Sequence, residues 1–217
     1  MPQDNAPRRT RGFTLIELLV VCAIIVIITG LLLTRQSKLD SSTLLRSLGY
    51  SVALSVRQAQ IFGTSIVSTQ VGGAPVFPPG YGLHFSSANP GSYILFADIA
   101  GASGKGNGVY DVGEEVQTFT LNKGYAIREF CAMQGTIKYC SGSDTTGTSI
   151  TKLDIIFRHP NPDACFSTDT VSNDCVPGAS SQFSSAYIQI QSTDGTTRSV
   201  VVTASGQISV QPPNTLP

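Results

Sequence analysis

A run of 21 mostly apolar residues near the N-terminus constrains this chain more than any other feature. Residues 13–33 read FTLIELLVVCAIIVIITGLLL, with Glu17 as their only charge. As a helix the run rises about 31 Å, at roughly 1.5 Å per residue, enough to cross a hydrocarbon core of about 30 Å. Because Arg8, Arg9 and Arg11 precede it, the positive-inside rule predicts a cytoplasmic N-terminus and an exported remainder. A secretory signal peptide fits less well, since its apolar region is shorter and no small-residue cleavage site follows the run here.

Glu17 is the anomaly of this segment. A carboxylate at the centre of a bilayer costs about 2.5 to 3.5 kcal/mol on insertion scales, and less near an interface. One interpretation is a first-turn glutamate that the helix dipole favours and that reaches the headgroups. The other is that Glu17 pairs with a positive group of another copy of the protein, such as an amino group created by cutting after Gly12. Both interpretations stay open on spacing alone.

The segment Gly12-Phe13-Thr14-Leu15-Ile16-Glu17 resembles the processing site of type IV prepilins and pseudopilins. The resemblance implies that a membrane prepilin peptidase cuts between Gly12 and Phe13 and that Phe13 becomes the N-methylated mature N-terminus. It also implies that Glu17 pairs with the Phe13 amine of a neighbouring subunit during filament assembly. The partners it implies are other pilin or pseudopilin subunits, an inner-membrane assembly platform, and membrane lipids before assembly.

The helical pattern does not stop at the end of the apolar run. Apolar residues continue at three- and four-residue steps as far as Phe62, and Gly63 is a plausible C-terminal stop. We therefore expect one long helix over residues 13–62, apolar all round in its first half and amphipathic in its second. Such a helix would leave a membrane or filament core and then cover one face of a sheet.

Short β-prone runs follow the helix, separated by clusters of glycine, proline, asparagine, aspartate and serine. The predicted strands are residues 65–71, 81–85, 93–97, 116–121, 126–130, 153–157, 186–191, 199–203 and 207–210. Asp194-Gly195 and Ser205-Gly206 predict turns in a closing meander. The predicted loops are residues 72–80, 101–108, 141–147 and 160–181.

The expected fold class is α+β, a long N-terminal helix packed on an antiparallel β domain as in pilins. The predicted organisation is a leader peptide at residues 1–12, a transmembrane or filament-core helix at 13–35 and an amphipathic half-helix at 36–63. A β-rich globular domain at 64–210 and a flexible tail at 211–217 follow. About 180 residues beyond the membrane segment suit one domain with a sizeable core.

Composition and charge agree with an exported domain that does not bind polyanions. Only 13% of the residues are charged, against about 25% in an average soluble domain. After Arg35 ten basic residues face twelve acidic ones, which leaves a net charge of −2 and no strong field for DNA.

Cysteine placement suggests an oxidising compartment. Cys22 lies in the apolar run, whereas Cys131, Cys140, Cys165 and Cys175 form two close pairs in the exported part. Four cysteines allow three connectivities, and proximity along the chain favours Cys131 with Cys140 and Cys165 with Cys175. Neither pair has the two-residue spacing of a zinc knuckle or a redox motif, so we expect disulfides.

The globular region contains YGLHF, YILFAD, a Gly/Asn loop followed by YDVGEE, and a meander that ends in GQISV. This texture resembles GspH/FimT-type minor pilins and pseudopilins. The resemblance implies two β-sheets packed on the C-terminal half of the helix, and a place at or near the tip of a type IV pilus or a type II secretion pseudopilus.

No catalytic motif is present in the sequence. Neither His84, expected on a strand surface or sheet edge, nor His159, expected in a loop, has a second histidine at ligand spacing. Residues 101–105 miss two positions of a phosphate loop. We therefore expect no enzyme and no firm cofactor.

One weak metal hypothesis concerns calcium. Asn107, Asp111 and Glu114 have the spacing of the fifth, ninth and twelfth positions of a calcium loop. The first and third positions would be Ser103 and Lys105, where carboxylates are expected. The competing interpretation is a glycine-rich loop whose polar residues stabilise turns.

The sequence thus indicates a structural, membrane-inserted subunit, more plausibly minor than major, of a type IV pilus or secretion pseudopilus. The expected location is the inner membrane, with a single pass and the globular domain outside, and then the filament. The alternative is a DNA-uptake or adhesive tip subunit. Some FimT-like pilins are understood to bind DNA through a Gly-Arg-x-Arg motif, whereas the similar place here reads Gly-Gln-Ile-Ser over residues 206–209, so DNA is not an expected partner.

Overall fold

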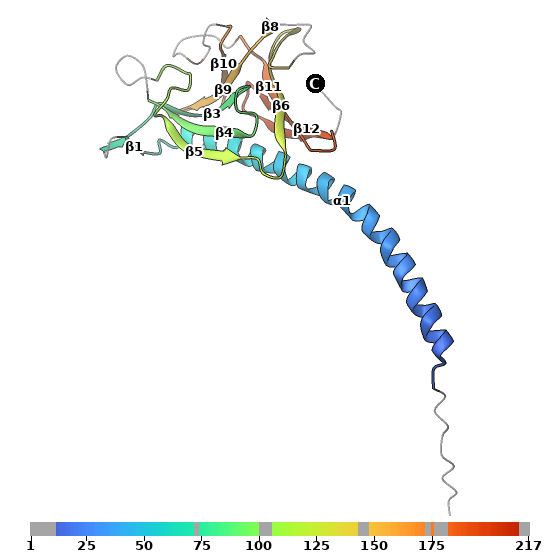
Figure 1. Ribbon diagram of the computed structural model, residues 1–217. Coiled ribbons are helices and arrows are strands. Elements are labelled where there is room, and N and C mark those ends of the chain that lie inside the picture. Colours follow the sequence, from blue (N-terminus) through green and yellow to red (C-terminus); the bar gives the residue numbers. More distant parts are fainter. Residues whose placement is uncertain are drawn as a thin grey trace, which may run out of the picture. The chain divides into compact units, whose positions relative to one another are not determined.

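The computed structural model describes residues 12–71, 74–99, 106–142, 148–171, 175 and 182–212 (Figure 1). The side chains of residues 34–41 are not among those described. The predicted leader therefore lies outside the described residues except for Gly12, and the predicted tail lies outside them beyond residue 212. The chain divides into two compact units, Met1–Asp40 and Ser41–Pro217.

One helix, α1, runs from Leu15 to Thr64, close to the predicted 13–62. The predicted stop at Gly63 has a packing reason that the sequence did not reveal. A side chain at Gly63 would place its Cβ only 2.3 Å from the carbonyl oxygen of Phe157, so glycine lets the last turn of α1 lie against a strand. The helix ends one residue later, and Ile66 takes a positive φ of 50° just beyond it.

Two sheets and one small hairpin form the rest of the described chain. The bounds of the thirteen strands are β1 Thr69–Val71, β2 Ala74–Val76, β3 Gly80–Ser86, β4 Ser92–Asp98, β5 Glu115–Thr120, β6 Ala126–Gln134, β7 Ile137–Cys140, β8 Thr148–Ser149, β9 Lys152–Arg158, β10 Ala164–Thr168, β11 Ser185–Gln191, β12 Thr197–Thr203 and β13 Ile208–Gln211. The five-stranded sheet has the order β10-β9-β3-β4-β5, and the six-stranded sheet has the order β13-β12-β11-β6-β7-β8. Pairing is antiparallel except between β7 and β8, which are parallel. The α+β prediction is confirmed.

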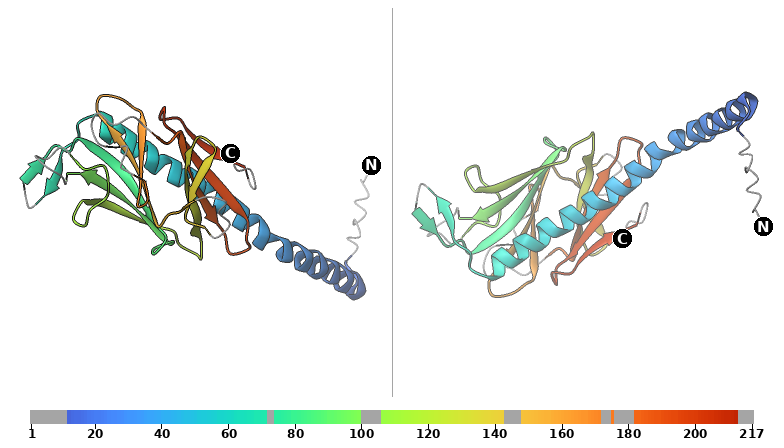
Figure 2. Two further views of the ribbon diagram at one scale, coloured as in Figure 1. Left: turned by 90° about the horizontal axis from the view of Figure 1, so that it is seen from above. Right: turned by 90° about the horizontal axis from the view of Figure 1, so that it is seen from below.

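The second half of α1 packs on both sheets and completes one core (Figure 2, right). Its buried face carries Leu45, Val52, Val56 and Ala59, whose spacing is that of one helix face. These side chains belong to the same apolar cluster as residues of β3, β4 and β9 in one sheet and of β6, β11 and β12 in the other.

Every predicted strand except the first matches an observed strand to within a few residues. The first, predicted at 65–71, keeps only Thr69–Val71, because α1 continues through Thr64. Four strands were not predicted: β2, β7, β8 and β10. Of these, β10 lies in the predicted loop 160–181, where flanking prolines and aspartates hid a five-residue strand that pairs with β9.

Candidate functional site: the N-terminal segment and the surface of the head

The start of α1 is set by a helix cap. Thr14 Oγ1 accepts the backbone N–H of Glu17 at 3.3 Å, and the Thr14 carbonyl accepts that of Leu18 at 3.2 Å. Threonine in this position satisfies one of the four free N–H groups at a helix start. This capping role of Thr14 is not among the predictions from the sequence, although Thr14 and Glu17 have the T-x-x-E spacing of a capping box.

The predicted processing and assembly residues lie together at this helix start. Gly12 and Phe13 precede α1, Phe13 is 80% exposed, and the side chain of Glu17 is exposed. A Cβ added at Gly12 would meet nothing within 4 Å. Within the described part of the chain no salt bridge involves Glu17.

The apolar segment behind Glu17 is consistent with membrane anchoring. Leu15–Leu33 is the helical segment of the described chain that is long and apolar enough to cross a membrane, with a mean hydropathy of 3.0 and no burial within the protein. The Thr29 hydroxyl donates to the carbonyl of Ile25 at 2.7 Å. This bond satisfies a polar group that would otherwise be costly in hydrocarbon.

Two disulfides join the cysteine pairs that separation along the chain favours. Cys131 and Cys140 are direct neighbours across β6 and β7, and Cys165 on β10 is bonded to Cys175. Glu129 lies close enough to Cys131 and Cys140 for the three to resemble a metal site. Both sulfurs are bonded to each other, however, and a disulfide does not provide the thiolates that zinc needs.

The calcium candidates lie in one loop, but their side chains form hydrogen bonds with one another and with backbone N–H groups. The amide of Asn107 donates to Asp111 at 2.6 Å. The carboxylate of Glu114, a buried side chain, accepts the N–H of Ile99 at 2.8 Å and that of Asp111 at 2.9 Å. This is the bonding of a loop stabilised by its own polar residues. Ser103 and Lys105, the other positions of the hypothesis, lie outside the described residues.

Beside this loop, the five-stranded sheet carries a buried ion pair on the face away from the core. Arg158 Nη2 on β9 lies 2.5 Å from Asp98 Oδ2 on β4, and Asp98 also accepts the N–H groups of Asn107 and Gly108. Gly80 on β3 stands in register between the two, and a Cβ there would lie 2.7 Å from Arg158 Cγ. Glycine therefore lets the pair meet across an intervening strand. Burial raises the pKa of the Asp98 carboxyl, and Arg158 opposes that rise.

His84 is the one histidine whose expected position needs correction. It was expected on a strand surface or edge, yet it is 7% exposed on the central strand β3. Its Nδ1 lies 2.6 Å from Asp154 Oδ1, and the ring of Tyr110 packs over it at 4.5 Å. The expectation failed because the loop that precedes β5 folds over the outer face of this sheet, and alternation within one strand does not reveal such a cover.

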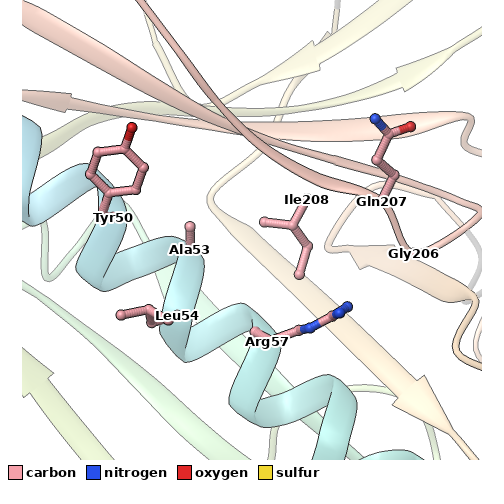
Figure 3. Close-up of a pocket in the computed structure, with 7 residues that line it drawn as sticks. All are labelled: Tyr50, Ala53, Leu54, Arg57, Gly206, Gln207 and Ile208. Atoms are coloured by element: carbon pink, nitrogen blue, oxygen red, sulfur yellow. The ribbon is translucent and has the colours of Figure 1, made fainter.

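A pocket of about 440 Å³ lies where α1 meets the turn between β12 and β13 (Figure 3). The helix contributes Tyr50, Ala53, Leu54 and Arg57, the turn contributes Gly206 and Gln207, and β13 contributes Ile208. Residues 206–208 read Gly-Gln-Ile and include no basic side chain.

Gln60 holds this turn on the helix. Its Nε2 donates to the carbonyl of Gly206 at 3.0 Å and to that of Pro162 at 2.8 Å. Because both acceptors are backbone atoms, this anchoring does not depend on the side chains of the turn.

Together, the exposed apolar helix segment and its first-turn carboxylate are consistent with a membrane-anchored class of protein, and the unit Ser41–Pro217 is its globular head. Comparison with known families agrees at the N-terminus: residues 7–33 match the prokaryotic N-terminal methylation motif. This match supports a type IV pilin-like protein, a structural kind rather than an enzyme. No curated protein and no solved structure gave a significant match.

Proposed function

We propose that this chain is a structural subunit, more plausibly minor than major, of a type IV pilus or a type II secretion pseudopilus. The observation that carries the proposal is the methylation motif at residues 7–33, which leads directly into the exposed apolar helix segment Leu15–Leu33. A helix of this hydropathy needs either lipid or other apolar helices around it. A filament subunit uses both in turn.

In this proposal a prepilin peptidase cuts between Gly12 and Phe13, and the new Phe13 amine is methylated. The arginines at positions 8, 9 and 11 keep the leader in the cytoplasm, so the β domain lies outside the inner membrane. The assembly platform then extracts the helix sideways into a growing filament. Glu17 receives the Phe13 amine of a neighbouring subunit, which offsets the cost of a carboxylate among apolar helices.

The head supports the finer assignment to the GspH/FimT type. The resemblance of the head sequence implies two sheets packed on the second half of one helix. In the structure, residues of β3, β4 and β9 in one sheet and of β6, β11 and β12 in the other pack on α1. The two disulfides suit a domain that works in an oxidising compartment.

Processing provides the direct test. Gly12→Val should leave the full-length chain in the membrane, because peptidase sites that need close backbone approach require a small residue. The fold itself should not change, since nothing lies within 4 Å of a Cβ at this position. N-terminal sequencing of the membrane and filament fractions should find methylated Phe13 first in wild type and Met1 in the variant.

Gly30→Val is the matched control, because Gly30 also has nothing within 4 Å of an added Cβ but lies within the helix. The control should be processed like wild type. Normal maturation of Gly12→Val would refute the proposed processing site.

A further inference from the structure

The loop before β5 presents an apolar side chain in an unusual way. Val112 is 93% exposed at the tip of a turn closed by the bond from Glu114 N–H to the Asp111 carbonyl at 3.2 Å. Gly113 takes φ 104° there, which is the left-handed conformation that a type II turn requires in its third position. The backbone conformation of this turn therefore holds the Val112 side chain in solvent.

Two exposed carboxylates flank this tip and make it rigid. Glu115 accepts the N–H of Gly113 at 2.9 Å and the hydroxyl of Tyr110, while Asp111 accepts the amide of Asn107. The Tyr110 hydroxyl lowers the pKa of Glu115, so that side chain carries its charge at neutral pH. A rigid loop loses little conformational entropy on binding.

The pocket between α1 and the β12–β13 turn is complementary to this tip, because it combines apolar side chains with arginines. Tyr50 and Leu54, which is 68% exposed, provide apolar surface, and Ile208 faces them from β13 (Figure 3). Arg57 lines the pocket, and Arg46 lies over the Tyr50 ring at 5.8 Å. Residues 42–64 contain no acidic residue. Among the described residues no carboxylate forms a salt bridge with either arginine.

The turn and the pocket of one chain cannot meet. Tyr110, next to the turn, packs on His84 at the outer face of the five-stranded sheet, whereas α1 packs on the inner face beside Leu83 and Phe85. The sheet separates the two surfaces. An interaction between them has to join two copies.

We propose that the tip Val112, with Asp111 and Glu115 beside it, docks into the pocket formed by Tyr50, Leu54, Arg57 and Ile208 of a second copy of this chain. The valine would enter the apolar part while the carboxylates face Arg57 and Arg46. Such a contact is heterologous, so a pair of copies still has one free turn and one free pocket, and further copies can be added at either end. This inference rests on the proposed filament function, to which it adds that at least two copies of this chain lie next to each other in one filament.

Cysteine cross-linking in the full-length chain tests the contact. Cys22, the free cysteine of the described chain, is first replaced by serine. Leu54→Cys and Val112→Cys in one chain should then give a ladder of covalent multimers on mild oxidation. Each single variant alone should give no ladder, and co-expression of the two single variants should stop at a dimer. Leu54→Cys with Thr193→Cys, an exposed position on another turn, should give no ladder.

Charge reversal provides the second arm. Arg57→Glu in the double-cysteine chain should lower the yield of multimers about tenfold, because like charges then face each other. Adding Asp111→Arg, which keeps the bonds of Glu115 to Gly113 and Tyr110, should restore much of the yield. A lower yield without this restoration would contradict the proposed pairing.

The outcomes separate this contact from the filament function. Absence of the ladder from filaments that contain the double-cysteine chain would overturn the contact and leave the function standing. A ladder confined to membranes, with no chain in filaments, would support the contact and overturn the function. A product that joins Leu54→Cys to a different protein would assign the pocket to another partner and overturn the proposal.

Discussion

Thr14 and Glu17 both lie at the start of α1, but only the side chain of Thr14 caps the helix. Thr14 accepts the N–H of Glu17 through its hydroxyl, so the helix start does not depend on the glutamate carboxylate. The exposed Glu17 side chain is then a charge held near one end of an apolar segment, where its cost is lower than at the bilayer centre. Structural and assembly roles can therefore be separated by mutation.

Glu17→Leu should be processed and stable in the membrane yet poorly incorporated into filaments. The substitution removes an unfavourable charge and eases insertion by up to about 3 kcal/mol, while it removes the group that we propose receives the Phe13 amine. The ratio of filament-bound to membrane-bound protein measures the effect. If Glu17 only faces headgroups, the ratio will equal that of wild type, and the assembly role is then rejected.

Among elements, the loop 106–114 shows how buried polar groups organise the head. Asp98 and Asp154 each project from a strand and accept backbone N–H groups of this loop. Hydrogen bonds to a charged acceptor contribute about 1.5 to 3 kcal/mol each. The loop is thus ordered by the sheet beneath it, and this order keeps the Val112 turn rigid.

Acid should weaken this loop through Glu115. Its pKa lies below the ordinary value of 4.5, first because the Tyr110 hydroxyl donates to it. A carboxyl with a lowered pKa in the folded state adds stability above its ordinary value, and this stability is lost as the pH falls through the folded value. Tyr110→Phe should therefore lose less thermal stability than wild type when the pH is lowered from about 6 to about 3.

Tyr139→Phe is the control for this comparison. The Tyr139 hydroxyl donates to the uncharged amide of Gln134 at 2.8 Å, so its removal should lower the melting temperature similarly at both pH values. Parallel acid profiles for wild type and Tyr110→Phe would show that the Glu115 bond does not contribute.

At the scale of the whole molecule, the segment of α1 within Ser41–Pro217 is part of the core rather than an accessory. Val52 and Val56 are fully buried in the cluster that includes both sheets. The two sheets therefore share their stabilising helix. We expect them to unfold in one cooperative transition.

Val56→Ala should test this shared core. Loss of two buried methyl groups and the resulting cavity should lower the free energy of unfolding by about 2 to 3 kcal/mol. Ser47→Ala, an exposed position on the same helix, should change it by less than about 0.5 kcal/mol. Denaturant unfolding of the detergent-solubilised protein, followed by far-UV circular dichroism and by tyrosine fluorescence, should give coincident curves; separate transitions would contradict a single core.

Much of the fold was predictable because its signals are local. The apolar run, the continuing helical period and the β-prone composition of strands such as β3, β9 and β12 are properties of neighbouring residues. The short strand β7 was not predicted because the only local sign of it is the two-residue turn at Gly135-Thr136, where the glycine has φ 59°. The strand β10 was not predicted because it is defined by its pairing with β9 and not by its own composition.

By itself the sequence determined the membrane-length helix, its first-turn carboxylate, the processing motif and the α+β class, since each depends on residues close together in the chain. Tertiary structure alone decided that His84 and Asp98 are buried under a loop, and that a turn and a helix form a pocket. Those features depend on contacts such as Gln60 with Gly206, 146 residues apart. Such contacts become favourable only once the whole core has assembled, because closing long loops has an entropic cost that no single local interaction offsets.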